Sequence, residues 1–241
     1  MARGKLSSAT FVLVHGAWHG GWCWARVARM LRDVGHTVHT PTLTGLGERA
    51  HLARPDVDLA LHVQDVVALI EAEELRQVIL VGHSYGGMVI TGVAAHAGGR
   101  LAHLVYLDAF VPSDGQSLLG LVGEELAAGV RAAAREHGEG WRIPPFPPER
   151  FGVTNPKDVE WLTRHLVPQP LQTFEQGVQA KDRPSLKRSY IYCAKPAMGA
   201  FDRYAALKSD RGWRYHELAT GHDAMVTAAP DLAKILADSA G

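Results

Sequence analysis

Short apolar runs alternate along this chain with longer segments in which apolar residues recur at helical spacing. Runs that are apolar nearly throughout are typical of strands buried on both faces of a parallel sheet. Residues 10–14 and 78–81 are runs of this kind, and further strands are expected over residues 36–40, 104–108, 189–193 and 214–218. The expected helices cover residues 25–34, 59–72 and 88–97, and a closing helix starts at residue 230. This alternation predicts an α/β fold with a mostly parallel, doubly wound sheet and right-handed crossovers.

The alternation stops between residues 113 and 187, where we expect no strand. Apolar positions at helical spacing predict a helix over residues 118–136, and a cluster of prolines then breaks the chain. Asn155 is a suitable N-cap for a further helix that has Pro156 at its first position. This second helix is expected to run through Leu166.

The position of this all-helical insertion, between two parts of one sheet, defines the expected domain organisation. Residues 1–112 and 188–241 form the predicted core, and residues 113–187 form a predicted helical cap over the carboxyl edge of the sheet. A chain of 241 residues is long enough to bury one large core of this kind.

Composition and charge exclude several classes of function. Hydrophobic residues make up 46% and charged residues 21% of the chain, the formal net charge is zero and the basic residues are scattered. This argues against nucleic acid or an anionic membrane as the main partner. No apolar run approaches the roughly 20 residues that span a bilayer.

Cysteine usage and the start of the chain favour a cytoplasmic protein. Cys23 and Cys193 are too few to form a disulfide framework, which fits a reducing compartment. Residues 1–5 lead into the first strand without the apolar core of a signal peptide.

The candidate chemistry starts at residues 82–87, Gly-His-Ser-Tyr-Gly-Gly. A buried strand precedes them and an Ala-rich helix follows, the context that makes Gly-x-Ser-x-Gly a nucleophile elbow. The turn is tight, so that small residues are needed at Gly82 and Gly86. The Ser84 hydroxyl is then presented above the edge of the sheet. The alternative interpretation is an ordinary glycine-rich βα turn.

A serine hydroxyl needs a base beside it to act as a nucleophile at neutral pH. The chain has 13 histidines, and we select His222 because it follows the last strand in a short Gly-His loop before the last helix. The alternative for this residue is a solvent-exposed loop histidine. His83, inside the elbow, is expected to pack or to form a local hydrogen bond.

Acyl transfer also needs two donors aimed at the developing oxyanion. We expect the backbone N–H of Tyr85, directly after the serine, to be one of them. The glycine-rich loop after the first strand should supply the other, from the N–H of Ala17. Trp18 in this loop is expected to border the substrate pocket; His19 lines the same loop and either touches substrate or braces it.

These stretches resemble the α/β-hydrolase superfamily over essentially the whole core. The sequences concerned are Val-Leu-Val-His-Gly-Ala-Trp-His-Gly-Gly-Trp-Cys-Trp, Val-Gly-His-Ser-Tyr-Gly-Gly-Met and the closing Gly-His-Asp. They are similar to the branch that holds plant methyl-ester esterases, hydroxynitrile lyases, and small bacterial carboxylesterases and pyrethroid hydrolases. The resemblance implies that Ser84 is the nucleophile, His222 the base, and Ala17 and Tyr85 the oxyanion donors. It implies no metal and no organic cofactor, and it places the predicted cap after the sixth strand in the family's count.

Two positions depart from the family's pattern. The hydroxynitrile lyases carry a lysine directly after the histidine, and this chain has Asp223 there. The family usually places the triad acid after its seventh strand, where this chain reads Cys193-Ala194-Lys195-Pro196 without a carboxylate. The candidates that remain are Asp202, within an expected helical piece, and Asp108, at the end of the sixth strand. We select Asp108, because it ends the strand beside the elbow strand; a turn-capping role is its alternative.

The sequence therefore predicts a serine hydrolase that cleaves a small to medium hydrophobic ester or lactone. Aromatic and aliphatic residues in or near the predicted cap, among them Trp161, indicate an apolar substrate pocket. One alternative is a lyase, cyclising or C–C-cleaving enzyme with the same triad. Another is a receptor-like protein that binds a small ligand with negligible turnover. We expect a monomer or a homodimer.

Overall fold

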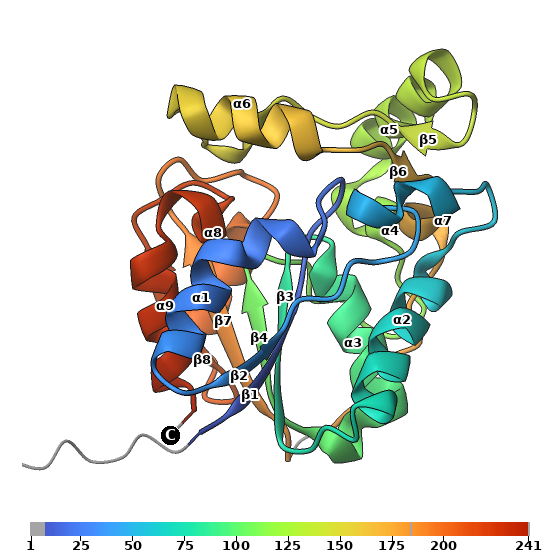
Figure 1. The fold of residues 1–241 in the computed structure, drawn as a ribbon. Helices are drawn as coiled ribbons and strands as arrows, with labels where there is room; N and C mark the ends of the chain where they lie inside the picture. Colours follow the sequence, from blue (N-terminus) through green and yellow to red (C-terminus); the bar gives the residue numbers. More distant parts are fainter. Residues whose placement is uncertain (1–7, 184, 241) are drawn as a thin grey trace, which may run out of the picture.

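Six strands form one parallel sheet in the order β2-β1-β3-β4-β7-β8, which confirms the predicted fold class (Figure 1). The structure is a computed structural model that describes residues 8–183 and 185–240. The strands are β1 (Thr10–Val14), β2 (Thr37–His39), β3 (Val78–His83), β4 (Leu101–Leu107), β7 (Lys187–Cys193) and β8 (Arg214–Leu218). The two central strands, β3 and β4, are almost fully buried, as expected from their continuous apolar runs.

Helices cover both faces of the sheet. Helices α1 (Ala25–Asp33) and α9 (Ala229–Asp238) pack together on one face, and α2 (Leu59–Ala72) and α3 (Gly86–Ala97) pack together on the other (Figure 1). A short helix, α8 (Ala224–Thr227), precedes α9. Five 3₁₀ helices lie in the described connections: η1 (Gly21–Trp24), η2 (Gly47–Leu52), η3 (Gly98–Arg100), η4 (Pro148–Phe151) and η5 (Asp202–Ser209).

The segment predicted as a cap is mainly helical, but it also contains a small sheet. Its helices are α4 (Leu118–Val122), α5 (Glu124–His137), α6 (Pro156–His165) and α7 (Gln172–Glu175). Strands β5 (Arg142–Ile143) and β6 (Gln169–Pro170) pair antiparallel, so the expectation of no strand in this segment is wrong. Two-residue strands are too short to show a periodic pattern, which is why the sequence does not reveal them.

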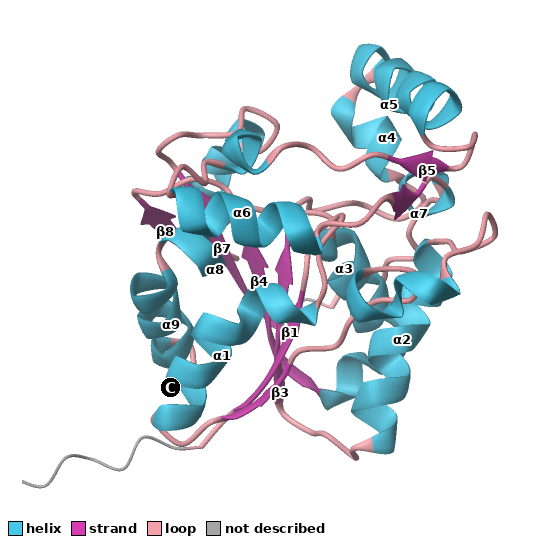
Figure 2. Ribbon diagram, turned by 45° about the horizontal axis from the view of Figure 1, so that its top comes forward, coloured by secondary structure: helices cyan, strands magenta, loops and turns pink. Residues whose placement is uncertain are grey.

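The single helix expected over residues 118–136 is divided into α4 and α5. Gly123 separates them with φ +88°, a backbone conformation that ends a regular helix and that glycine adopts readily. The second predicted helix is confirmed as α6, with Pro156 at its first position and the Asn155 side chain accepting from the Lys157 N–H. In Figures 1 and 2, α4, α5 and β5 lie together, apart from α6.

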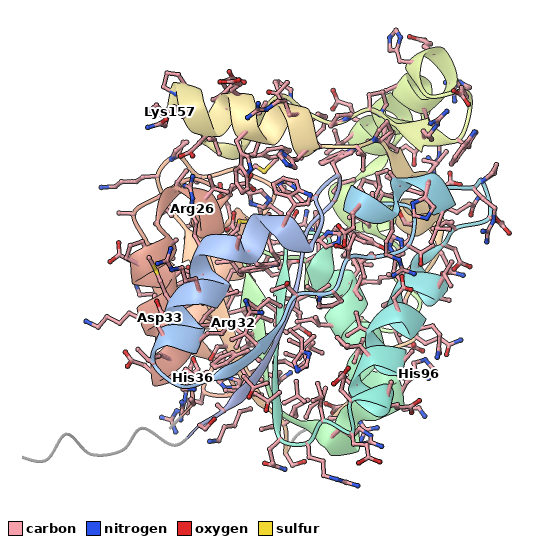
Figure 3. The ribbon with its side chains drawn as sticks, in the orientation of Figure 1. Arg26, Arg32, Asp33, His36, His96 and Lys157 are labelled. Atoms are coloured by element: carbon pink, nitrogen blue, oxygen red, sulfur yellow. The ribbon has the colours of Figure 1, made fainter. Side chains whose placement is uncertain are left out.

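The insertion is bonded to the core at several places. Arg26 on α1 forms an ion pair with Asp158 on α6, and Figure 3 shows Arg26 directly beneath that helix. At the other end of the insertion, the Gln176 side chain donates to Asp58, the N-cap of α2, at 2.7 Å. These contacts fix the insertion above the carboxyl ends of the strands.

The sequence predicted neither a signal peptide nor a membrane-spanning segment, and the structure bears on these two expectations differently. The prediction about a signal peptide depends on residues 1–5, and these lie outside the described residues. Within the described ranges, no helix combines the length and the apolar character that crossing a membrane would require.

Candidate active site

The register of the central strands brings the candidate residues to one edge of the sheet. Val14 at the end of β1 pairs with Gly82, and His83 at the end of β3 pairs with Leu107. Leu107 in turn pairs with Ile191 on β7. The loops that follow these strands therefore leave the sheet side by side, at the edge that faces the insertion.

Ser84 lies in a sharp turn between β3 and α3. Its φ is +54°, which costs a non-glycine residue roughly 1–2 kcal/mol. The Ser84 backbone is held there by three hydrogen bonds: its N–H donates to the Leu107 carbonyl, and its carbonyl accepts from Gly87 and Phe110. The turn therefore has the strained strand-to-helix geometry of a nucleophile elbow.

The two flanking glycines are needed for the turn to close. A Cβ on Gly82 would lie 2.5 Å from the Gly86 carbonyl oxygen. A Cβ on Gly86 would lie 2.9 Å from the carbonyl oxygens of Val14 and His15. These contacts are with backbone atoms, which cannot move aside without displacing the strand.

We expect Gly82→Ala to lower the free energy of unfolding by about 2–4 kcal/mol, because the added methyl group meets backbone in a closed core. Gly129→Ala is the matched control, since the same methyl group enters open space on α5 and improves helix propensity by roughly 0.5–1 kcal/mol. Urea denaturation measures both changes. Equal stability of the two variants would contradict the steric account of the elbow.

His222 lies in the loop between β8 and α8, and its imidazole is hydrogen bonded to Asp108. The distance from His222 Nδ1 to Asp108 Oδ2 is 2.7 Å, and both side chains are buried. The other carboxylate oxygen, Oδ1, accepts from the Cys193 N–H at 3.1 Å. Asp108 is acceptor-only when ionised, so Nδ1 of His222 carries the hydrogen, and in the neutral ring the lone pair is then on Nε2.

The alternative acid, Asp202, lies elsewhere. It is exposed at the start of η5 and accepts from the Tyr192 hydroxyl at 2.6 Å. Of the two carboxylates that the sequence leaves open, the structure brings Asp108 to His222.

Two further side chains fix the plane of the His222 ring. Phe201 stacks on it with ring centroids 4.9 Å apart, and His83 packs against it at 4.4 Å. His83 Nε2 lies 3.1 Å from the His222 carbonyl oxygen and donates to it, as expected for a local role. Burial, followed by the nearby His222 and His19, holds the pKa of His83 well below its ordinary value. Sequence reasoning missed Phe201, which carries no signal beyond being an aromatic residue in a loop.

His15 orients the first peptide of the glycine-rich loop. Its Nδ1 donates to the Gly16 carbonyl at 2.8 Å, and its Nε2 accepts from the Leu43 N–H at 3.1 Å. Burial lowers the pKa of His15 to about 3, so this ring is neutral. Because the C=O and N–H of a trans peptide point in opposite directions, the Ala17 N–H points away from the His15 ring.

Ala17 and Tyr85 border the same cavity as Ser84. Among hydrogen bonds between described residues, none uses the backbone N–H of either one as donor. Tyr85 is the residue that precedes α3, so its N–H belongs to the positive end of that helix. Both N–H groups are therefore available to an oxygen atom in the cavity.

Trp18 is clamped by the small sheet of the insertion. Its backbone N–H donates to Gln169 Oε1 at 3.1 Å, and its indole N–H donates to the Ile143 carbonyl at 3.0 Å. The Trp18 carbonyl accepts from Val167 at 3.0 Å. Gln169 is fully buried and was missed by sequence reasoning, because an isolated glutamine in a loop gives no sign of a partner 151 residues away.

The cavity at Ser84 has a volume of about 80 Å³ and is almost entirely apolar. It is lined by Ala17, Trp18, Ser84, Tyr85, Phe110, Leu118, Val122, Leu126, Val130, Phe146, Phe151, Phe174, Met198, Ala200, Phe201 and His222. Five of these residues, from Leu118 to Phe146, belong to the insertion segment that contains α4 and α5, and Phe151 and Phe174 follow in the same insertion.

Of the three predicted pocket residues, Trp18 lines this cavity, and His19 and Trp161 are not among its lining residues. The His19 ring is turned toward Asp223 and is only 2% exposed. Trp161, on α6, packs edge-on against Trp22 at 5.0 Å, with the Arg26 guanidinium over its ring. Its aromatic surface therefore joins α6 to the core and does not face the cavity.

His83, His222 and Asp223 have metal-ligand atoms within 4.8 Å of one another. One nitrogen of each histidine already has a partner, since His222 Nδ1 is bonded to Asp108 and His83 Nε2 to a carbonyl. We therefore assign these side chains to the hydrogen-bond network of the site.

Comparisons with known proteins agree with this geometry. Residues 11–235 match the alpha/beta hydrolase family. A carbendazim hydrolyzing esterase from Nocardioides sp. is 45% identical, over 95% of this chain and 98% of that protein. An extracellular alpha/beta-hydrolase from a Paenibacillus species is 28% identical, with a TM-score of 0.83 over 95% of this chain and 98% of its own. A pyrethroid hydrolase from Sphingobium faniae is 26% identical, with a TM-score of 0.75 over 97% and 98%. The chain therefore belongs to the alpha/beta hydrolase family and to its esterase-type enzymes.

Proposed function

We propose that this protein is a serine hydrolase that cleaves a small to medium hydrophobic carboxylic ester or lactone through an acyl-enzyme. The observation that carries the proposal is the buried His222–Asp108 hydrogen bond, beside an apolar cavity into which a strained turn presents Ser84. The three residues are the proposed nucleophile, base and acid.

In the first half of the reaction, Ser84 Oγ attacks the carbonyl carbon of the ester and His222 Nε2 takes the hydroxyl proton. Asp108 keeps Nδ1 protonated, so that Nε2 is the basic nitrogen, and it stabilises the imidazolium that forms. The negative charge that develops on the carbonyl oxygen is stabilised by the N–H groups of Ala17 and Tyr85.

Collapse of the tetrahedral intermediate breaks the ester C–O bond, and His222 returns its proton to the leaving alkoxide. A water molecule then attacks the acyl-Ser84 carbonyl while His222 takes one of its protons. The bond between Ser84 Oγ and the acyl carbon breaks, His222 returns the proton to Oγ, and the carboxylic acid leaves. These steps require no metal or organic cofactor, because the base, the acid and the oxyanion donors are all supplied by the protein.

The cavity supports a substrate with a short apolar group next to its carbonyl. The cavity volume is about 80 Å³ and its walls are almost entirely apolar. We propose that residues 113–187 act as a cap that closes this cavity from above, because α4 and α5 supply much of its wall. Residues 1–112 and 188–241 then form the hydrolase core. A cytoplasmic location and a monomeric or homodimeric state are also part of the proposal.

The proposal is tested by steady-state kinetics on p-nitrophenyl esters from acetate to decanoate, together with carbendazim, the compound named for the Nocardioides relative. We expect multiple turnovers on the acetate and butyrate esters and a fall in kcat/KM with longer chains. Turnover of none of these esters, with tight binding of an ester, would favour the receptor-like alternative. Release of product only from cyanohydrins or β-keto acids would favour the lyase or C–C-cleaving alternative.

We expect Leu126→Ala to raise the octanoate-to-acetate ratio of kcat/KM by about tenfold. Leu126 lies on α5, lines the cavity and is 42% exposed, so its truncation opens the cavity toward solvent without removing buried core. A single methylene group in an apolar pocket is worth roughly 1–3 kcal/mol of discrimination. Met30→Ala is the control, since Met30 is an exposed apolar residue on α1, outside the cavity. The same ratio in both variants would show that α5 does not limit chain length.

A further inference from the structure

His19 is a buried histidine whose two ring nitrogens both face acceptors. Nδ1 lies 2.7 Å from the Ala17 carbonyl oxygen, and Nε2 lies 3.1 Å from Asp223 Oδ2. A carbonyl and a carboxylate can only accept, so both nitrogens must carry hydrogen for both bonds to form. The geometry therefore describes His19 as an imidazolium paired with the Asp223 carboxylate.

The surroundings of His19 support this charge state. Burial alone would lower the pKa of His19, but the charge of Asp223 and the hydrogen bond to it raise the pKa above its ordinary value. The other titratable groups near the pair are His15, His83, Cys23 and His222, which has a ring nitrogen within 4.8 Å of an Asp223 carboxylate oxygen. His15 and His83 are neutral because burial lowers their pKa values, and burial raises the pKa of the Cys23 thiol. His222 is hydrogen bonded to Asp108, so Asp223 is the one carboxylate among these groups that faces His19.

One end of the pair fixes the peptide that follows Ala17. The carbonyl of this peptide accepts from His19, and its N–H, which belongs to Trp18, donates to Gln169. The preceding peptide is held through its own carbonyl by His15. With both carbonyls held, rotation about the Ala17 backbone is blocked and the Ala17 N–H keeps one orientation.

The other end of the pair is joined to the base. Asp223 follows His222 directly, its N–H donates to the Phe151 carbonyl, and its carbonyl accepts from Val226 and Thr227 at the start of α8. The His19–Asp223 contact therefore crosses 204 residues of sequence to join the loop of the oxyanion donor to the loop of the base.

We infer that His19 and Asp223 are positioning residues for the proposed ester hydrolysis. The doubly protonated His19, held by Asp223, fixes the Ala17–Trp18 peptide. It thereby keeps the Ala17 N–H at a fixed position relative to His222. Neither residue touches the substrate, and both act through the geometry of the oxyanion donor. The inference rests on the proposed function, because the donor matters only if an oxyanion forms.

The charge state of His19 predicts how kcat depends on pH. A histidine with a raised pKa contributes its interaction fully at low pH and loses it as pH rises through that pKa. The kcat of the wild type should therefore hold on the alkaline side until His19 loses its proton. Asp223→Asn removes the charge that keeps His19 protonated, so the alkaline fall of kcat should move to lower pH.

The experiment compares Asp223→Asn, His19→Gln and the double variant with the wild type on p-nitrophenyl acetate, across pH 5–10. We expect each single variant to lose about 10- to 100-fold in kcat at neutral pH, with KM within about threefold, because the donor acts mainly in the transition state. The double variant should lose no more than the worse single variant, since both changes break one contact. His36→Gln is the control: His36 is a buried histidine at the opposite end of the sheet, labelled in Figure 3.

Asp223→Asn with wild-type kcat and an unshifted alkaline limb would overturn the inference, as would a loss carried by KM alone or shared by His36→Gln. Should the variants not fold, nitrogen NMR of histidine-labelled wild type decides, because a His19 ring with one proton at pH 7 also overturns it. Fluorophosphonate labelling of the wild type is run in parallel. Absence of label would refute the proposed function, whereas label with unaltered variant kinetics would refute only the positioning role.

Discussion

Ser84→Ala is expected to lower kcat on p-nitrophenyl acetate by about 10⁴-fold or more while the protein keeps its fold. Removal of the nucleophile leaves only binding and the oxyanion donors, which cannot form an acyl-enzyme. The change deletes one hydroxyl group from a half-buried side chain, and the backbone hydrogen bonds of the turn are retained. Thermal melting within a few degrees of the wild type is therefore part of the expected result.

The matched control for this variant is Ser113→Ala, an exposed serine outside the cavity. We expect its kcat to equal that of the wild type. Esterase activity within tenfold of wild type in purified Ser84→Ala would show that the elbow serine is not the nucleophile.

Asp108→Asn is expected to cost about 10³- to 10⁴-fold in kcat, against less than threefold for Asp202→Asn. An asparagine amide can still accept from the Cys193 N–H, so the fold around position 108 is preserved. The same amide can present its NH₂ group to His222 Nδ1, which favours the tautomer with its proton on Nε2 and removes the base. Among described residues, the Asp202 side chain is hydrogen bonded only to the Tyr192 hydroxyl, and an amide oxygen can accept that bond equally well.

Steady-state kinetics at several pH values, with thermal melting of each variant, separates a catalytic loss from a folding defect. If Asp202→Asn is inactive and Asp108→Asn still hydrolyses the ester, then Asp202, which follows the family's usual strand, is the triad acid. In that case the His222–Asp108 hydrogen bond would be structural only.

The parts of this molecule that follow from local sequence were predictable. Local sequence located all six strands of the main sheet, and apolar spacing located α2 with its observed bounds. The choice of Asp108 followed from topology, because parallel strands bring their carboxyl ends to one edge and β4 lies beside the elbow strand. The nucleophile elbow could be predicted from the sequence, because the tight turn allows only small residues at Gly82 and Gly86.

The parts that depend on distant partners were not predictable. His19 was expected at the substrate pocket, but a carboxylate 204 residues further along the chain turns its ring away. Gln169 and Ile143 clamp Trp18 through strands of two residues each, which leave no periodic pattern. The break at Gly123 follows from a backbone conformation that a glycine permits but does not require.

The central claim, that Ser84 is acylated during turnover, is tested most directly by intact-protein mass spectrometry after treatment with a serine-directed fluorophosphonate. The account predicts one phosphonyl adduct per chain, located on the peptide that contains Ser84, and loss of esterase activity in proportion to labelling. It also predicts protection by a slowly hydrolysed ester and no adduct on Ser84→Ala. An adduct on another residue, or full esterase activity in a fully labelled protein, would contradict it.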